Sequence, residues 1–142
     1  MRKGPFVGLL AVLMLLGVFF VYLQAGEGKM KMNKQVIEGT LVDTKCYAMG
    51  GFLTNDHMSM DGKKLPNCAV ACASMGIPVA LVDKDGNVHV LAVPAAAYKD
   101  WMAKELRLTG MTGKHAPVFI PEKLEVKENG KWVEKQLPGT MM

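Results

Sequence analysis

The sequence predicts a mainly β domain with two short helices, a small OB-like β-barrel preceded by one N-terminal apolar helix. Three observations lead to this prediction. Short stretches rich in β-branched residues recur along the chain, turns rich in Asn, Asp and Gly separate them, and residues 6–23 form an uncharged apolar run. Short strands cannot bury both faces in a flat sheet of this size, so we expect a closed or partly closed barrel, with a sandwich as the alternative.

The bulk properties allow one folded domain in the 142 residues. After the N-terminal segment about 110 residues remain, enough for a single core. We therefore expect an OB-like barrel domain over residues 35–137 and a short tail over 138–142. The net charge is +4, but the lysines lie beside acidic residues and form no continuous basic stripe, which argues against nucleic-acid binding.

The N-terminus has the order of an export signal or a membrane anchor, predicted over residues 1–25. Arg2 and Lys3 precede the apolar run from Phe6 to Leu23, which at 18 residues also reaches the lower limit for spanning a bilayer. Cleaved signal and uncleaved anchor both remain open. Either one predicts a periplasmic or extracytoplasmic domain, secreted or held at the membrane by a tether over residues 26–34.

The first predicted strand covers "QVIEGTLVD" from Gln35, with Gly39 marking a bend or bulge. Residues 44–64 are rich in Gly, Asn, Asp and Lys, and predict a long loop. A short helix follows, because Asn67 can cap it, or Pro66 can occupy its first position, and Gly76 stops it.

The second half of the chain predicts two hairpins and another helix. "PVALVDKDGNVHVLAV", residues 78–93, predicts two strands joined by a turn. "PAAAYKDWMAKEL", residues 94–106, predicts a helix with four large residues on one face, namely Tyr98, Trp101, Met102 and Leu106. "LRLTG" predicts a strand, and residues 123–135 predict a hairpin about Asn129 and Gly130 with Leu124 and Val126 facing inward.

Three cysteines are the main candidates for chemistry. Cys68 and Cys72 are four residues apart on the first predicted helix, so their side chains project from one face. Side chains one turn apart start about 5 to 6 Å apart, too far for an undistorted disulfide but suitable for holding one soft ion. Cys46, at the end of the first strand, can supply a third sulfur.

The loop offers further ligands. His57 with the three cysteines would complete a tetrahedral zinc site, whereas added thioethers would favour monovalent copper. The candidate metal ligands are therefore Cys46, His57, Cys68 and Cys72, with Met58, Met60 and Met75 as additional candidates. The preferred hypothesis is a non-catalytic exported domain, tethered to the membrane, that binds zinc or copper.

Two other hypotheses follow from the same cysteines. Exported thiols tend to oxidise, so Cys46 can form a disulfide with either helix cysteine, as in a stapled accessory subunit of a membrane redox complex. Alternatively, Cys68 in the first helical turn and Cys72 can act as a thiol-disulfide oxidoreductase. The sequence has no phosphate loop or dinucleotide fingerprint and no CxxCH motif, so neither a nucleotide nor covalent haem is expected.

Read in order, "GTLVDTKCY", "CAVACASMGIPVALV" and "DGNVHVL" resemble a group of small exported bacterial proteins. The pattern of that group runs G-x-(V/L)-V-D-x-x-C-Y, then a His, then C-A-x-x-C-x-x-x-G-x-P, and the resemblance covers residues 36 to 127. It implies an OB-like fold and a site at Cys46, His57, Cys68 and Cys72. It implies no particular activity.

Overall fold

A computed structural model describes residues 34–139 of the chain. The predicted anchor over 1–25, and the tether apart from Lys34, lie outside the described residues. Within residues 34–139, no helix is long and apolar enough to span a bilayer. In chain order the elements of this part are β1 (Gln35–Asp43), α2 (Thr44–Gly50), β2 (His57–Met58), β3 (Lys64–Leu65), α3 (Cys68–Ser74), β4 (Val79–Val82), β5 (Val88–Val90), the 3-10 helix η2 (Ala95–Trp101), β6 (Glu105–Thr112), β7 (Phe119–Glu128) and β8 (Lys131–Lys135).

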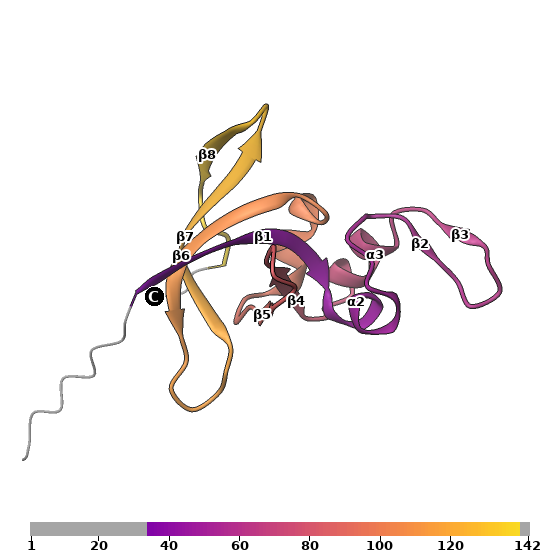
Figure 1. The fold of residues 1–142 in the computed structure, drawn as a ribbon, viewed down its shortest axis with the longest axis horizontal. Coiled ribbons are helices and arrows are strands. Elements are labelled where there is room, and N and C mark those ends of the chain that lie inside the picture. The colour runs from indigo at the N-terminus through magenta and orange to yellow at the C-terminus, as the bar shows by residue number, and fades with distance from the viewer. Residues whose placement is uncertain (1–33, 140–142) are drawn as a thin grey trace, which may run out of the picture. The chain divides into compact units, whose positions relative to one another are not determined.

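Six strands form one antiparallel sheet in the order β5-β4-β1-β6-β7-β8, and β2 and β3 form a separate small hairpin (Figure 1). The mainly β prediction is confirmed, but the closed barrel is not found. β5 and β8 remain the two edges of the described sheet, and a single isolated bridge joins Leu91 to Phe119. Because β5 is only three residues long, it offers little backbone for further pairing.

Strand β1 changes partners along its length. Its first part pairs with β6 and its last part with β4, and Thr40 is paired on both sides, with Val82 and Glu105. A side chain at Gly39 would meet the Val82 carbonyl oxygen at 2.1 Å, so only glycine allows this close approach. The pairing of β1 with β6 runs through Gly39 without a register shift, so the bulge expected at Gly39 is not found in this pairing.

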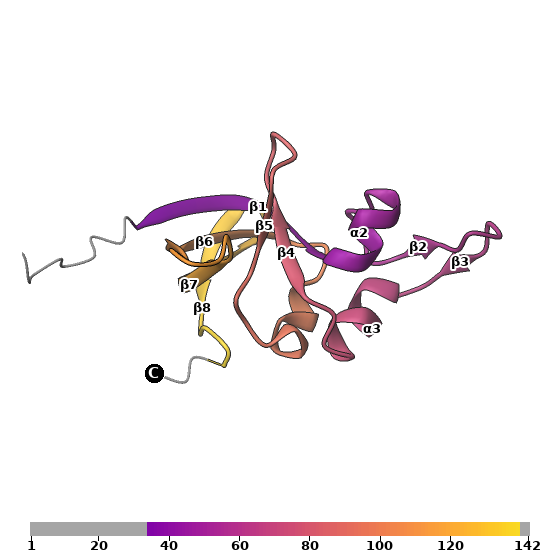
Figure 2. The ribbon, with the colours of Figure 1, turned by 90° about the horizontal axis from the view of Figure 1, so that it is seen from below.

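The two faces of β1 pack against different helices (Figure 2). Alternate residues of a strand point to opposite faces. Leu41 joins the main core, to which α3 contributes Ala69 and Ala73 and η2 contributes Tyr98, whereas Val42 joins a smaller cluster that Tyr47 of α2 covers. The end of β1 therefore lies between α2 and α3. The largest buried side chains of the main core are Tyr98, Phe119, Leu41, Leu81, Met102, Leu106, Leu108, Leu124, Val79 and Val126.

The prediction of a continuous loop over residues 44–64 is wrong. Thr44–Gly50 form α2, and the chain then forms the β2–β3 hairpin. Asp43 caps the start of α2 with its side chain, and Gly51 ends it with a φ of 66° and a bond from its N–H to the Tyr47 carbonyl. Residues 44–50 show little helical periodicity, so the helix is defined by its caps at Asp43 and Gly51.

The second predicted helix is shorter than expected. η2 is a 3-10 helix that ends at Trp101, and Leu106 belongs to β6 rather than to a helical face. Ala103 has a φ of 59°, which turns the chain into the strand. Tyr98 and Met102 are buried in the core as predicted, and Trp101 is only partly buried.

Both predicted hairpins are confirmed. β4 pairs with β5, and β7 pairs with β8 around Asn129 and Gly130, which both have positive φ as a tight hairpin turn requires. Leu124 and Val126 are fully buried, as predicted.

Candidate metal centre

The start of α2 fixes the position of Cys46. Asp43 is both the last residue of β1 and the cap of α2, and its Oδ1 accepts a hydrogen bond of 2.8 Å from the Cys46 backbone N–H. An aspartate at this position satisfies an amide that the helix itself leaves unpaired. The side chain of Cys46, in the first turn of α2, is buried.

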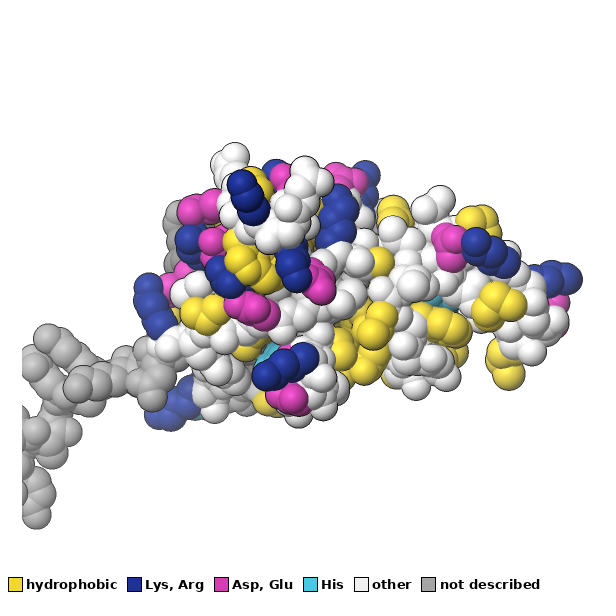
Figure 3. Space-filling model, turned by 45° about the horizontal axis from the view of Figure 1, so that its top comes forward, with side chains coloured by type: hydrophobic (Ala, Val, Ile, Leu, Met, Phe, Trp, Pro, Cys, Tyr) yellow, Lys and Arg dark blue, Asp and Glu magenta, His cyan; other side chains and the backbone are white. Residues whose placement is uncertain are grey.

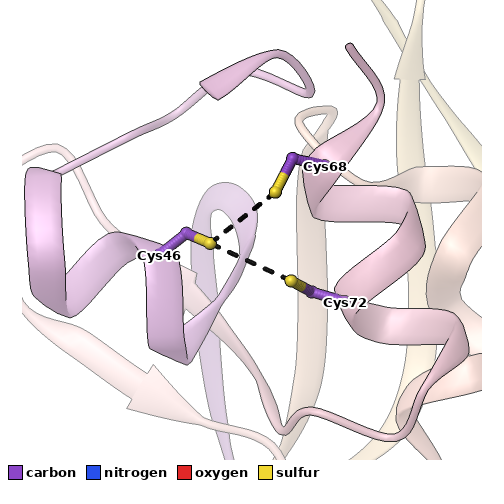
Figure 4. A group of neighbouring side chains, drawn as sticks. All are labelled: Cys46, Cys68 and Cys72. Carbon is purple, nitrogen blue, oxygen red and sulfur yellow. Dashed lines mark hydrogen bonds between the residues drawn. The ribbon is translucent and has the colours of Figure 1, made fainter. Parts of the chain in front are cut away.

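Helix α3 carries the other two cysteines. Cys68 and Cys72 occupy successive turns and point toward Cys46 (Figure 4). Ala69 and Ala73 on the same helix are buried, and their small side chains let α3 lie close to the core. The helix begins at Cys68 as predicted, although Asn67 adopts a left-handed conformation and makes no capping bond with its side chain.

The three sulfur atoms form one group. Cys46 Sγ lies 4.0 Å from Cys68 Sγ and 3.9 Å from Cys72 Sγ, and all three atoms lie within 4.8 Å of one another. A disulfide bond measures about 2.05 Å, so all three cysteines are free thiols. Metal–sulfur bonds of about 2.3 Å place the sulfurs of a tetrahedral site about 3.8 Å apart. The observed spacing therefore suits a shared ion.

A second group overlaps the first at Cys46. Ligand atoms of Asp43, Cys46 and His57 also lie within 4.8 Å of one another, and all three side chains are buried. The Phe52 ring stacks on the imidazole with a centroid distance of 4.7 Å. His57 Nε2 lies 2.9 Å from the Thr54 carbonyl oxygen, while among the described residues Nδ1 has no hydrogen-bond partner.

Burial and negative charge dominate the electrostatics of the site. Burial raises the pKa of the Cys46 thiol far above its ordinary value, and the hydrogen bond and charge of Asp43 raise it further. Burial and the charge of Asp43 also raise the pKa of the Cys72 thiol. In the described part of the chain, Asp43 forms no ion pair with Lys or Arg, and its Oδ2 lies 4.0 Å from His57 Nε2. The site therefore concentrates acidic groups with little positive charge beside them.

Some of the predicted ligands lie close together in the structure, and others do not. Cys46, Cys68 and Cys72 form one group, and His57 is close to Cys46. The methionines are exposed instead, with exposed fractions of 53% for Met58, 105% for Met60 and 74% for Met75. Figure 3 shows hydrophobic side chains on the surface near the β2–β3 hairpin and α3.

Sequence reasoning missed Asp43. Its position three residues before Cys46, at the junction of a strand and a helix, is the signal that could have identified it. An aspartate that caps a helix can bring its second carboxylate oxygen close to a cysteine of the first turn. The site thus contains a buried carboxylate beside the thiols.

Comparison of the chain with protein-family models, with curated proteins and with solved structures found no match.

Proposed function

We propose that this chain is a non-catalytic, exported and membrane-tethered domain that binds one soft metal ion, zinc or copper. Cys46, Cys68, Cys72 and His57 are the ligands. The observation that carries the proposal is the convergence of three free sulfurs from two helices within 4.8 Å. Thiolate ligands select zinc and monovalent copper over harder ions. Export and tethering remain predictions from the N-terminal sequence.

The charge of the site supports a cation. Asp43 is buried with an exposed fraction of 1%, and no lysine or arginine in the described part pairs with it. A buried carboxylate without a positive partner is costly. A metal ion would provide that positive charge and would convert the neighbouring thiols to thiolates, because thiol ligands lose their protons on coordination.

Histidine supplies the fourth ligand in this proposal. Zinc in structural sites is almost always four-coordinate, and three cysteines with one histidine is a common ligand set. His57 is buried, lies beside Cys46 and has a ring nitrogen with no hydrogen-bond partner among the described residues. The ligands come from α2, β2 and α3, so a bound ion would connect all three segments of the excursion between β1 and β4.

Metal content and thiol reactivity test the proposal together. We expect full-length protein, purified in detergent, to carry about one equivalent of zinc or copper by elemental analysis. Its three thiols should resist alkylation until a chelator removes the ion. Cys46→Ser should lose the ion, whereas the control Met60→Ala, which alters an exposed side chain, should retain it.

Protein that folds but takes up neither ion, with thiols equally reactive before and after chelator treatment, would contradict the proposal.

A second candidate is the disulfide-stapled accessory subunit of a membrane redox complex. Cys46 lies at nearly equal distances from both helix cysteines, 4.0 and 3.9 Å, so either pairing is accessible. Mass spectrometry of protein alkylated under denaturing conditions separates the two, because a staple leaves one modified cysteine and a metal site leaves three.

The thiol-disulfide oxidoreductase is less well supported. Such enzymes depend on a cysteine whose thiol pKa is lowered. Here burial and the charge of Asp43 raise the pKa of Cys72, the thiol that would resolve a mixed disulfide formed at Cys68. A protein that lacks disulfide-exchange activity but binds metal would agree with this reading of the site.

A further inference from the structure

The two overlapping groups of the site differ in the metal they suit. The first contains only sulfur atoms, from Cys46, Cys68 and Cys72. The second shares only Cys46 with the first and contains the imidazole of His57 and the carboxylate of Asp43. Monovalent copper is a soft ion that sulfur ligands alone can satisfy. Zinc instead takes four ligands in structural sites and accepts imidazole nitrogen as readily as thiolate.

The hydrogen bonds of His57 determine which ring nitrogen can bind. A carbonyl oxygen can only accept, so the contact of 2.9 Å between Nε2 and the Thr54 carbonyl requires that Nε2 carries the proton. In the neutral ring, Nδ1 then holds a lone pair. That atom is buried and, within the described residues, has no hydrogen-bond partner.

An imidazole that donates one N–H to a carbonyl and keeps a lone pair on its other nitrogen is arranged like a metal ligand. Ligating histidines usually donate their other N–H to a carbonyl or carboxylate, which fixes the tautomer. Thr54 provides the carbonyl, and Asp43 Oδ2 lies 4.0 Å from the same Nε2. Phe52 stacks nearly parallel on the ring, at 16°, and restricts its rotation. A buried lone pair without a partner is costly unless something binds it.

We infer that His57 determines metal specificity: zinc binds through three sulfurs and His57 Nδ1, whereas monovalent copper binds through the sulfurs of Cys46, Cys68 and Cys72 alone. The inference rests on the proposed function, because both ions occupy the same centre. It assigns the histidine to one ion only. It also explains why a buried histidine lies beside Cys46 without completing its hydrogen bonds.

The test compares both ions in full-length protein with and without the histidine. His57→Gln keeps a polar side chain of similar size, and His57→Phe keeps an aromatic ring that can stack on Phe52. If one of the two variants does not fold, the other still allows the measurement. His115→Gln is the control, because His115 is an exposed loop residue. Affinities for Zn²⁺ and for Cu⁺ under reducing conditions are measured by competition with chelators, and circular dichroism monitors the fold.

We expect both His57 variants to lose about 100-fold in zinc affinity, the upper end of the range for changes around a metal site, and to lose less than about threefold for Cu⁺. Co²⁺ replaces Zn²⁺ as an optical probe. The intense visible absorption of tetrahedral cobalt should weaken in the His57 variants and persist in His115→Gln.

Equal losses for Zn²⁺ and Cu⁺ would overturn the inference while leaving the metal-binding function intact, and so would unchanged affinity for both ions. Wild-type protein that binds neither ion would overturn the proposed function itself, and this inference with it. The two failures are therefore distinguishable.

Discussion

Asp43 combines two roles in one carboxylate. Oδ1 accepts the Cys46 backbone N–H and so begins α2, while Oδ2 faces His57 at 4.0 Å. The first role is structural and requires only an acceptor oxygen. The second places negative charge beside His57 and the thiols, and a bound cation would balance that charge. These roles can be separated by substitution, because asparagine keeps an acceptor oxygen and removes the charge.

Asp43→Asn should weaken metal binding without disturbing α2. Loss of a carboxylate next to a metal site typically costs about 10- to 100-fold in affinity, and we expect a loss of that size for zinc. Chelator competition measures the affinity, and circular dichroism measures the helix content. Asp43→Ala removes the cap as well, so it should additionally destabilise the fold by about 1 kcal/mol.

Equal zinc affinity in Asp43→Asn and in wild type would show that the charge plays no part in the site. Equal stability of the alanine and asparagine variants would show that the cap contributes nothing.

At the residue scale, the ligand types were predictable and their surroundings were not. The four-residue spacing of Cys68 and Cys72 predicts one shared helical face, and the structure confirms it. The burial of His57 and the exposure of Met58 depend on which face of β2 packs inward. His57 stacks on Phe52 in the fold, a tertiary contact that local sequence does not specify.

Among the elements, α2 was not predicted from the sequence. It carries Cys46, which belongs to both groups of candidate ligands. Its seven residues include a glycine, and it is too short to be stable from propensity alone. Its cap and the packing of Tyr47 on the outer face of β1 and β4 stabilise it instead. Hairpins were easier to predict, because turn residues act locally.

The β4–β5 turn illustrates such a local signal and permits a pH test. Asp83 accepts hydrogen bonds from the backbone N–H groups of Asp85 and Asn87 and contacts His89 Nε2 at 3.1 Å. Hydrogen bonds from Asn87, followed by those of His89 and the backbone, lower the pKa of the Asp83 carboxyl well below its ordinary value. The folded state therefore binds this proton less readily than the unfolded state.

The sign of the effect on stability follows from that difference. Asp83 stabilises the fold at pH values above its unfolded pKa, about 4, and this contribution is lost as the pH falls through the lowered folded pKa. Asp83→Asn should therefore unfold at lower urea concentration than wild type at pH 7, and the gap should narrow at pH 3. Asp85→Asn, which changes an exposed acid in the same turn, is the control. A gap between Asp83→Asn and wild type that stays constant from pH 7 to pH 3 would contradict the assignment.

On the scale of the whole molecule, the sheet acts as a platform and the excursion from Thr44 to Ser74 carries the site. The core of the sheet is built from alternating strand residues, which the sequence pattern predicts well, as Leu124 and Val126 show. Closure of the sheet was not predictable in the same way, because it depends on whether β5 and β8 can pair across the molecule. Strand length and twist decide that, and β5 is too short to extend the sheet.

The packing of the two helices on the sheet also positions the cysteines. α2 and α3 are anchored on opposite sides of β1 by Tyr47 and Ala73, so Cys46 and Cys72 meet beside the end of one strand. Their distance is therefore determined by packing of the whole domain. A metal ion bound there would stabilise the fold, because ligand binding to the native state shifts unfolding.

The most direct measurement of the central claim is X-ray absorption at the metal edge of full-length protein loaded with one equivalent of zinc. We expect the nearest neighbours of the zinc to be mainly sulfur at about 2.3 Å, with a smaller contribution from one nitrogen at about 2.0 Å. Cys46→Ser should lose the sulfur shell. A first shell made only of oxygen and nitrogen in the wild-type protein would contradict the claim that the three cysteines hold the ion.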